Sequence, residues 1–188
     1  MKNIFYHASN EKFDEILPLS NNHGGDGTVS YFTCNRAYAL FYIRDMNINH
    51  VTCGIDDNGI PVYYEQFPQQ LKILYGGRSG YIYTAINNGE IVSGHTNGVW
   101  ISTQPIKVTS ASFIKDVYDE IIKAEGNGEV QIIRYEDLSE EKKLRTTEMI
   151  CNSILKHKYI SNDCAKSRFI KENFPEAWNM AEEKVKHY

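Results

Sequence analysis

The alternation of hydrophobic and polar positions divides the chain into a strand-rich first part and a helical tail. Short runs of β-branched and aromatic residues, bounded by glycine, proline, asparagine or aspartate, are typical of strands. The third and fourth of these runs predict a hairpin, because Asn58 and Gly59 between them suit the positive backbone angles of a tight turn. We expect strands at residues 3–7, 29–33, 50–55, 61–67, 80–86, 99–108 and 129–135.

Apolar residues recur at helical spacing in five other segments, which therefore predict helices. Asn35 can cap the first of them, and Gly76 and Gly77 end the second. Many short strands followed by helices favour an α+β fold over a doubly wound parallel sheet. The expected helices cover residues 35–46, 68–78, 110–124, 139–158 and 162–187, the last interrupted at Pro175.

The length and composition fit one soluble domain. A chain of 188 residues can bury one sizeable core, and its 41% hydrophobic and 23% charged residues are near the averages for globular proteins. No segment approaches about 18 consecutive apolar residues, and the N-terminus lacks an apolar signal core, so we expect a cytoplasmic protein that does not enter a membrane. We assign residues 1–138 to a core and residues 139–188 to a helical extension packed on it.

The charge and the cysteine pattern exclude several classes of site. Residues 1–138 hold 10 Lys and Arg against 16 Asp and Glu, whereas residues 139–188 hold 10 against 8. Neither balance gives the concentrated positive field that nucleic-acid binding needs, so a nucleic-acid partner is not expected. The histidines show no metal-ligand spacing, and the cysteines form no C-x-x-C pair, so the sequence predicts neither a metal site nor a disulfide framework. The four thiols are Cys34, Cys53, Cys151 and Cys164.

Three residues of the strand-rich part are candidates for a ligand site. His7 lies in the first expected strand, Tyr31 in the second, and Tyr42 in the first expected helix. A strand histidine is commonly satisfied by a neighbouring group, and tyrosines commonly pack in the core. Alternatively, the two rings flank one pocket, since a tyrosine ring stacks on a ligand while its hydroxyl stays hydrated. The residue types alone leave both interpretations open.

Three ordered blocks of sequence resemble those of the ADP-ribosyltransferase-like fold, in the branch of the diphtheria toxin and poly(ADP-ribose) polymerase catalytic domains. The blocks are YHAS at residues 6–9, VSYFTCNRAYALFY at residues 29–42 and WISTQP at residues 100–105. The interval from Tyr31 to Tyr42 is similar to that between the family's two nicotinamide-stacking tyrosines. Bacterial and phage members of unassigned function look closer still, through the GYIYTA stretch. The resemblance implies split antiparallel sheets with flanking helices over residues 1–135.

The resemblance also implies a substrate and a role for each matched residue. NAD would be the substrate, and its ADP-ribose would pass to a macromolecular target such as a protein. His7 would hydrogen-bond the nicotinamide ribose, the backbone of Ala8 would pair with the carboxamide, and Tyr31 and Tyr42 would sandwich the nicotinamide ring. Loss of nicotinamide develops positive charge on the ribose, so a carboxylate near the ribose hydroxyls stabilises the transition state. The implied catalytic residues are His7, Tyr31 and Gln104.

The third block departs from the family's pattern at this carboxylate. By register Ser102, Thr103 and Gln104 stand around the position of the family's glutamate, and none of them can carry a negative charge. Three explanations stay open: Glu90 or Glu65 supplies the acid, Gln104 substitutes with altered chemistry, or the pocket binds a ligand without turning it over. The alternative to an enzyme is therefore a non-catalytic interaction module on the same fold.

Two further features lie outside the family's pattern. Ala8 replaces the usual glycine and adds a methyl group where the backbone must approach the ligand closely. The C-terminal helices have no counterpart in the three blocks. These helices carry the aromatic residues Phe169, Phe174 and Trp178. Such residues either pack on the protein's own core or contact a partner chain.

Overall fold

The computed structural model describes residues 4–20, 28–45 and 52–186, which fall into two compact units. The first unit comprises Met1–Arg44, Cys53–Tyr63 and Leu71–Ile132, and the second comprises Asp45–Thr52, Tyr64–Gln70 and Ile133–Tyr188. Predicted segments that reach into residues 1–3, 46–51 and 187–188 lie in part outside the described residues.

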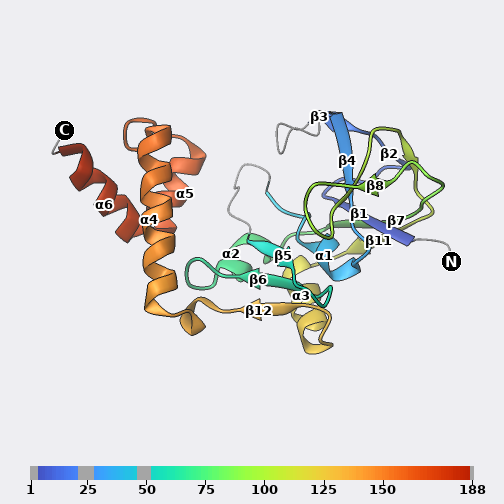
Figure 1. Ribbon diagram of the computed structural model, residues 1–188, viewed down its shortest axis with the longest axis horizontal. Coiled ribbons are helices and arrows are strands. Elements are labelled where there is room, and N and C mark those ends of the chain that lie inside the picture. The colour runs from blue at the N-terminus through green and yellow to red at the C-terminus, as the bar shows by residue number, and fades with distance from the viewer. Residues whose placement is uncertain (1–3, 21–27, 46–51, 187–188) are drawn as a thin grey trace. The chain divides into compact units, whose positions relative to one another are not determined.

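A three-stranded antiparallel sheet carries the first sequence block. Its central strand is β7 (Gly80–Ile86), with β1 (Ile4–Ser9) on one side and β11 (Ser110–Ile114) on the other (Figure 1). The β-branched and aromatic residues of β7 alternate between the two faces, as the period of two in its sequence requires. His7 pairs with Tyr83 across this sheet.

A second antiparallel sheet carries the other two blocks. Its strands are ordered β3 (Leu19–Ser20), β4 (Thr28–Phe32), β9 (Trp100–Ser102) and β8 (Val92–Ser93). The pairing sets Tyr31 opposite Ile101 and Phe32 opposite Trp100. The second and third blocks are thus neighbouring strands, although about 70 residues separate them in sequence.

Among the described residues, the two sheets are joined by one bridge, between Tyr6 of β1 and Thr33, the residue that follows β4. Tyr6 N–H donates to Thr33 O at 2.7 Å, and Thr33 N–H donates to Tyr6 O at 2.9 Å. This pair of reciprocal bonds is antiparallel, like the pairs within each sheet. Buried side chains of this unit form a core cluster of Phe5, Ile16, Phe32, Tyr83, Ala85, Ile91 and Ile106.

Shorter elements complete the first unit. Helix α1 (Arg36–Leu40) follows β4 and is capped by Asn35, whose side chain accepts a hydrogen bond from Tyr38 N–H at 3.0 Å. A hairpin of β5 (Cys53–Ile55) and β6 (Pro61–Tyr64) lies beside β12 (Gln131–Ile133). The remaining elements are β2 (Glu15–Ile16), which pairs with β10 (Ile106–Lys107), α2 (Gln70–Tyr75) and α3 (Val117–Gly126).

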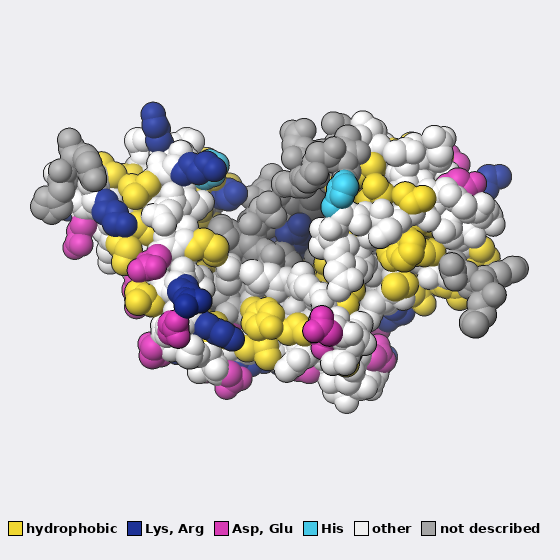
Figure 2. All heavy atoms as spheres, in the orientation of Figure 1, with side chains coloured by type: hydrophobic (Ala, Val, Ile, Leu, Met, Phe, Trp, Pro, Cys, Tyr) yellow, Lys and Arg dark blue, Asp and Glu magenta, His cyan; other side chains and the backbone are white. Residues whose placement is uncertain are grey.

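The second unit is helical. Figure 1 shows α4 (Glu140–His157), α5 (Ala165–Asn173) and α6 (Pro175–Lys186) gathered into one bundle, with the short turns η1 (Tyr135–Asp137) and η2 (Tyr159–Ser161) between elements. Their apolar faces bury a shared core, and the aromatic residues Phe174 and Trp178 belong to it. Ion pairs join side chains one turn apart along α4, namely Lys143–Glu140 and the exposed pair Arg145–Glu141. Figure 2 shows Lys, Arg, Asp and Glu side chains spread over the surface of the molecule.

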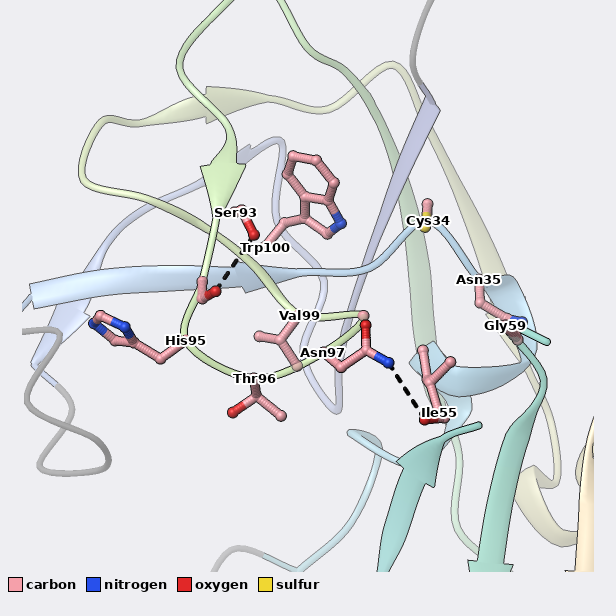
Figure 3. Close-up of a pocket in the computed structure, with 12 residues that line it drawn as sticks. Cys34, Asn35, Ile55, Gly59, Ser93, His95, Thr96, Asn97, Val99 and Trp100 are labelled. Atoms are coloured by element: carbon pink, nitrogen blue, oxygen red, sulfur yellow. Dashed lines mark hydrogen bonds between the residues drawn. The ribbon is translucent and has the colours of Figure 1, made fainter. Parts of the chain in front are cut away.

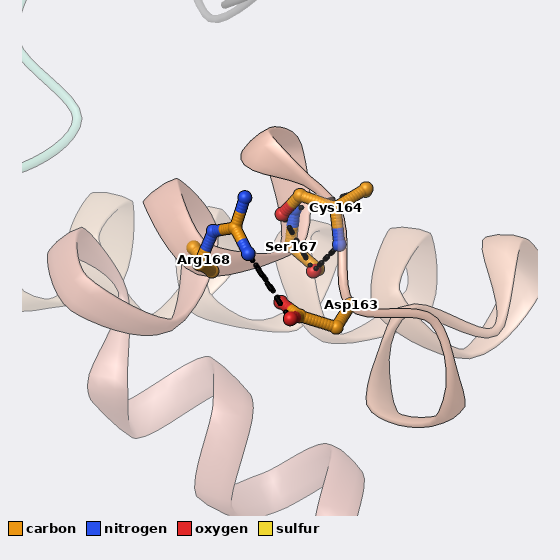
Figure 4. Close-up of polar contacts among 4 residues, drawn as sticks. All are labelled: Asp163, Cys164, Ser167 and Arg168. Carbon is orange, nitrogen blue, oxygen red and sulfur yellow. Dashed lines mark hydrogen bonds and ion pairs between the residues drawn. The ribbon is translucent and has the colours of Figure 1, made fainter.

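Helix α5 starts with an unusual cap. The Cys164 thiolate or thiol accepts a hydrogen bond from Ser167 N–H, and the Ser167 hydroxyl in turn accepts one from Cys164 N–H at 2.9 Å (Figure 4). This reciprocal arrangement is a capping box in which cysteine takes the place of serine or threonine. Arg168 forms an exposed ion pair with Asp163 beside it.

The predicted α+β class with antiparallel sheets is confirmed, and two expected helices are partly wrong. The helix expected at residues 35–46 is α1, which ends at Leu40, so Tyr42 lies in the turn after it. Residues 110–114 form strand β11 instead of the first turns of a helix, and α3 starts only at Val117, capped by Asp116. Pairing with β7 makes residues 110–114 extended, because every residue from Ser110 to Ile114 has a partner on β7. This pairing outweighs the helical spacing of Phe113. In the β5–β6 hairpin only Gly59 has a positive φ, of 79°, and Asn58 does not.

Candidate functional site

His7 is held by a hydrogen bond to the neighbouring strand. Its Nδ1 lies 2.8 Å from the backbone oxygen of Tyr31. Because a carbonyl oxygen only accepts, Nδ1 carries the proton, and in the neutral ring Nε2 is left with a lone pair. The contact joins the first and second sequence blocks directly. It also fixes the tautomer that a ligand would meet, namely an acceptor at Nε2.

The imidazole of His7 is surrounded by aromatic rings. Its centroid lies 5.8 Å from that of Phe13, 5.7 Å from that of Phe32 and 6.1 Å from that of Tyr83. Burial lowers the pKa of His7 below its ordinary value, and the hydrogen bond to Tyr31 opposes this only in part. His7 is therefore neutral at pH 7, which suits an acceptor for a hydroxyl group.

Ala8 and Tyr31 share a face that His7 does not share. The bridge pairs Tyr6 with Thr33, and side chains alternate between faces along each strand. Ala8 therefore lies on the Tyr6 face of β1, Tyr31 lies on the Thr33 face of β4, and His7 lies on the other face of β1. The side chains of His7 and Tyr31 thus point to opposite faces. They are joined through the Tyr31 backbone, and a ligand that contacts both side chains would have to cross the end of β4.

Tyr42 is held in place by Tyr38. The two rings meet edge to face, with centroids 5.7 Å apart and an interplanar angle of 84°. Burial, followed by the neighbouring Tyr38, raises the pKa of Tyr42 far above its ordinary value. Their hydrogen bond raises the pKa of Tyr42 and lowers that of Tyr38, as expected when the Tyr42 hydroxyl donates. The Tyr38 hydroxyl donates onward to the backbone oxygen of Cys53 at 3.4 Å.

The segment that carries Tyr42 lies against the end of β1. Asn10 Nδ2 donates to the backbone oxygen of Arg44 at 3.0 Å. A Cβ atom at Gly80 would lie 2.6 Å from Ile43 Cγ2 and 2.6 Å from the backbone oxygen of Ser9, so only glycine permits this approach. The structure thus brings the residues after α1 to the end of the His7–Ala8 strand.

The third block offers no acid at its expected position. Gln104 is exposed in the turn between β9 and β10. The Ser102 hydroxyl is buried and occupied, since it donates to Gln104 O at 2.9 Å and accepts from Gln104 N–H at 3.1 Å. The aromatic contacts of the His7 ring are to Phe13, Phe32 and Tyr83.

The two alternative acids occupy different places. Glu90 is exposed in the turn after β7. Tyr83, the strand partner of His7, lies three residues before Ile86, the last residue of β7, and three residues of a strand span about 10 Å. Glu65 belongs to the second unit, where it is buried and its Oε2 accepts a hydrogen bond from Tyr135 N–H at 3.3 Å. Glu65 therefore has a structural role at the start of η1.

Sequence reasoning missed the residues that surround the candidates. Tyr83 is fully buried, its hydroxyl donates to Glu11 O at 2.5 Å and accepts from Phe13 N–H at 3.1 Å, and Phe13 stacks on it with centroids 4.3 Å apart. The alternation of β7 indicates that Tyr83 is a buried strand residue. Nothing in the sequence indicates its link to the loop at Glu11–Phe13, because that contact spans about 70 residues.

Within residues 4–20, 28–45 and 52–186, no group of three or more His, Cys, Asp or Glu side chains could hold a metal ion. Across the same residues, no helix combines the length and apolar character needed to cross a bilayer. Comparison of the chain with known protein families found no family model that matches, and comparison with curated proteins found no match either.

Proposed function

We propose that the first unit binds NAD at the strands of the three sequence blocks, as an ADP-ribosyltransferase-like protein. The adjacency of β1, β4 and β9 carries this proposal. These strands are far apart in sequence, yet β1 is bridged to β4 by Tyr6 and Thr33, and β4 is paired with β9. A common ligand site for the three blocks requires such adjacency.

In this proposal the matched residues of the first two blocks each have a role that their chemistry suits. The neutral His7 accepts a hydrogen bond from a ribose hydroxyl at Nε2, since its Nδ1 is committed to Tyr31 O. The nicotinamide end lies on the face shared by Ala8 and Tyr31. Tyr42, fixed edge-on by Tyr38, supplies the second ring of the sandwich.

The transfer step consists of one substitution at the anomeric carbon of the nicotinamide ribose. The C–N bond to nicotinamide breaks, and nicotinamide leaves with the bonding pair. A nucleophilic atom of the target protein forms the new bond and releases its proton to solvent. Positive charge on the ribose in the transition state would be stabilised by a carboxylate, and Gln104 cannot supply that charge.

A second candidate function is a binding module that does not turn NAD over. The exposed, uncharged Gln104 and the occupied hydroxyl of Ser102 favour it, because neither provides a negative charge at the third block. Both functions share the NAD site and differ only in catalysis.

Isothermal titration of NAD into wild-type protein and three variants tests the shared site. Tyr31→Ala and Tyr42→Ala should each weaken binding by about two- to tenfold, because each removes one aromatic stacking contact. Tyr64→Ala is the matched control, since this tyrosine lies in the second unit and is 43% exposed. No binding to wild type, or equal binding by all three variants, would contradict the proposal.

Release of nicotinamide separates the two functions. A wild-type NAD glycohydrolase or transferase rate that disappears in His7→Ala supports the enzyme. NAD binding without nicotinamide release, with and without added protein extract as acceptor, supports the binding module.

A further inference from the structure

A pocket in the first unit lies where three segments meet. It has a volume of about 460 Å³, in the range of small-molecule sites. One wall is the turn from β4 into α1 at Cys34 and Asn35, another is the β5–β6 hairpin at Ile55 and Gly59, and the third is the loop from Ser93 to Trp100 (Figure 3). None of these residues is assigned to NAD above.

The pocket walls are tied together by side-chain amides. Asn35 Nδ2 donates to the backbone oxygen of Gly59 at 3.3 Å, and Asn97 Nδ2 donates to that of Ile55 at 3.5 Å. A Cβ atom at Gly98, where φ is +73°, would lie 2.1 Å from Ile55 Cδ1. The loop can therefore pack on the hairpin only because residue 98 is glycine. These contacts preform the cavity, which lowers the cost of ordering it around a ligand.

The lining carries no Asp, Glu, Lys or Arg, and its titratable groups are the His95 imidazole and the Cys34 thiol. A charged ligand would lose its hydration there without gaining a counter-charge, which is costly. An uncharged ligand does not face this penalty. A site for phosphates commonly relies on arginine or lysine, which this lining lacks, and the helix capped by Asn35 has only five residues.

Hydrogen-bond donors and acceptors nevertheless line the pocket. The indole of Trp100 offers an N–H donor, and in Figure 3 its nitrogen points toward Cys34. Among the described residues the indole N–H, the Thr96 hydroxyl and Asn97 Oδ1 have no hydrogen-bond partner within the protein. Ile55, Val99 and the indole ring supply apolar surface beside these groups.

We propose that this pocket binds an uncharged, hydroxyl-bearing small molecule, of the chemistry shared by free sugars and nucleosides. Hydroxyl groups both donate and accept, so they match the indole N–H and the Asn97 oxygen at once. The carbon face of a sugar or the ring of a base covers the apolar part of the wall. The proposal does not depend on NAD binding.

Protection of Cys34 from iodoacetamide tests the proposal, because this exposed thiol lies in the pocket lining. The full-length protein is alkylated with and without methyl β-D-glucopyranoside, methyl β-D-ribofuranoside or uridine, and Cys34 is followed by peptide mass spectrometry. Glucose 6-phosphate, ribose 5-phosphate, uridine monophosphate and NAD form the charged arm. The methyl glycosides and uridine show whether a sugar or a nucleoside supplies the hydroxyl groups that bind.

At least one uncharged probe should slow alkylation of Cys34 by about tenfold at saturation, and its phosphorylated counterpart should bind at least about tenfold more weakly. Trp100→Phe keeps the ring packed on Phe5 but removes the donor, and Thr96→Val removes the hydroxyl from an exposed loop residue; both should reduce protection. Thr109→Val, another exposed threonine outside the pocket, is the matched control and should leave protection unchanged.

Three results would overturn the proposal. One is that no uncharged probe protects Cys34, and a second is that the charged counterparts protect it equally well. The third is that NAD alone protects Cys34, in which case the pocket is part of the NAD site and the proposed function is supported while this inference fails.

Discussion

Buried polar groups serve different purposes in the two units. In the helical unit they satisfy backbone N–H groups at turns and helix starts. Ser167 completes the cap of α5, Gln70 Oε1 accepts from Gln66 N–H, and Glu65, although 70 residues away in sequence, accepts from Tyr135 N–H at the start of η1. In the sheet unit they join strands and loops that are distant in sequence, as His7 does with Tyr31 and Tyr83 with Glu11. Substitutions in the sheet unit should therefore change the geometry of the candidate site, whereas those in the helical unit should change stability alone.

The largest expected effect comes from the apolar core of the helical unit. Ile154 on α4 is fully buried, so Ile154→Ala should lower the free energy of unfolding by about 2–5 kcal/mol through lost burial and the cavity left behind. Leu144→Ala on the same helix is the control, because Leu144 is 54% exposed and should cost within about 0.5 kcal/mol. Urea titration followed by far-UV circular dichroism measures both, and equal losses would contradict the burial of Ile154.

A smaller effect is expected from protonation of His7 in the sheet unit. Its pKa in the folded protein is lowered by burial, so on acidification the unfolded state takes up the proton first. The free energy of unfolding should then fall as the pH drops below about 6.5, by up to about 1.4 kcal/mol per pH unit, until the folded-state pKa is reached. Urea titrations between pH 7 and pH 5 measure this slope.

Two variants isolate the contribution of His7 to this slope. His7→Asn places an amide nitrogen near the position of Nδ1 without a titrating group, and the slope should become shallower. His157→Gln should leave it unchanged, because His157 is exposed on α4. An unchanged slope in His7→Asn would show that His7 does not carry the effect.

The smallest effect concerns two thiols, one from each unit. The backbone N–H of Ser167 and its side chain lower the pKa of Cys164, whereas burial raises the pKa of Cys53. Iodoacetamide at pH 7 should therefore alkylate Cys164 before Cys53, which peptide mass spectrometry can follow. Faster reaction at Cys53 would mean that the cap of α5 does not favour the thiolate.

The sequence predicted those elements that local chemistry determines. The cap at Asn35, the strand at 80–86 and the restart of the last helix at Pro175 are all confirmed. The strand at residues 110–114 could not be predicted, because its spacing fits a helix and only its pairing with β7 makes it extended.

The candidate site could be predicted only as a set of residues. The spacing of the blocks singled out His7, Tyr31 and Tyr42, but it could not show that His7 and Tyr31 meet through a backbone oxygen. The support from Tyr38 and Tyr83 was also hidden, since each acts through a hydroxyl whose partner is set by tertiary structure. Packing between distant strands, which no local pattern encodes, decides these contacts.

The bridge between Tyr6 and Thr33 also determines on which face of the β1–β4 junction each side chain lies. A slip of one residue along β1 would exchange His7 and Ala8, because neighbouring strand residues point to opposite sides. The imidazole would then stand on the face where the Ala8 methyl group now lies. Two backbone hydrogen bonds thus fix the register of β1 against β4, and with it the face on which each side chain lies. The two sheets share no other pairing among the described residues.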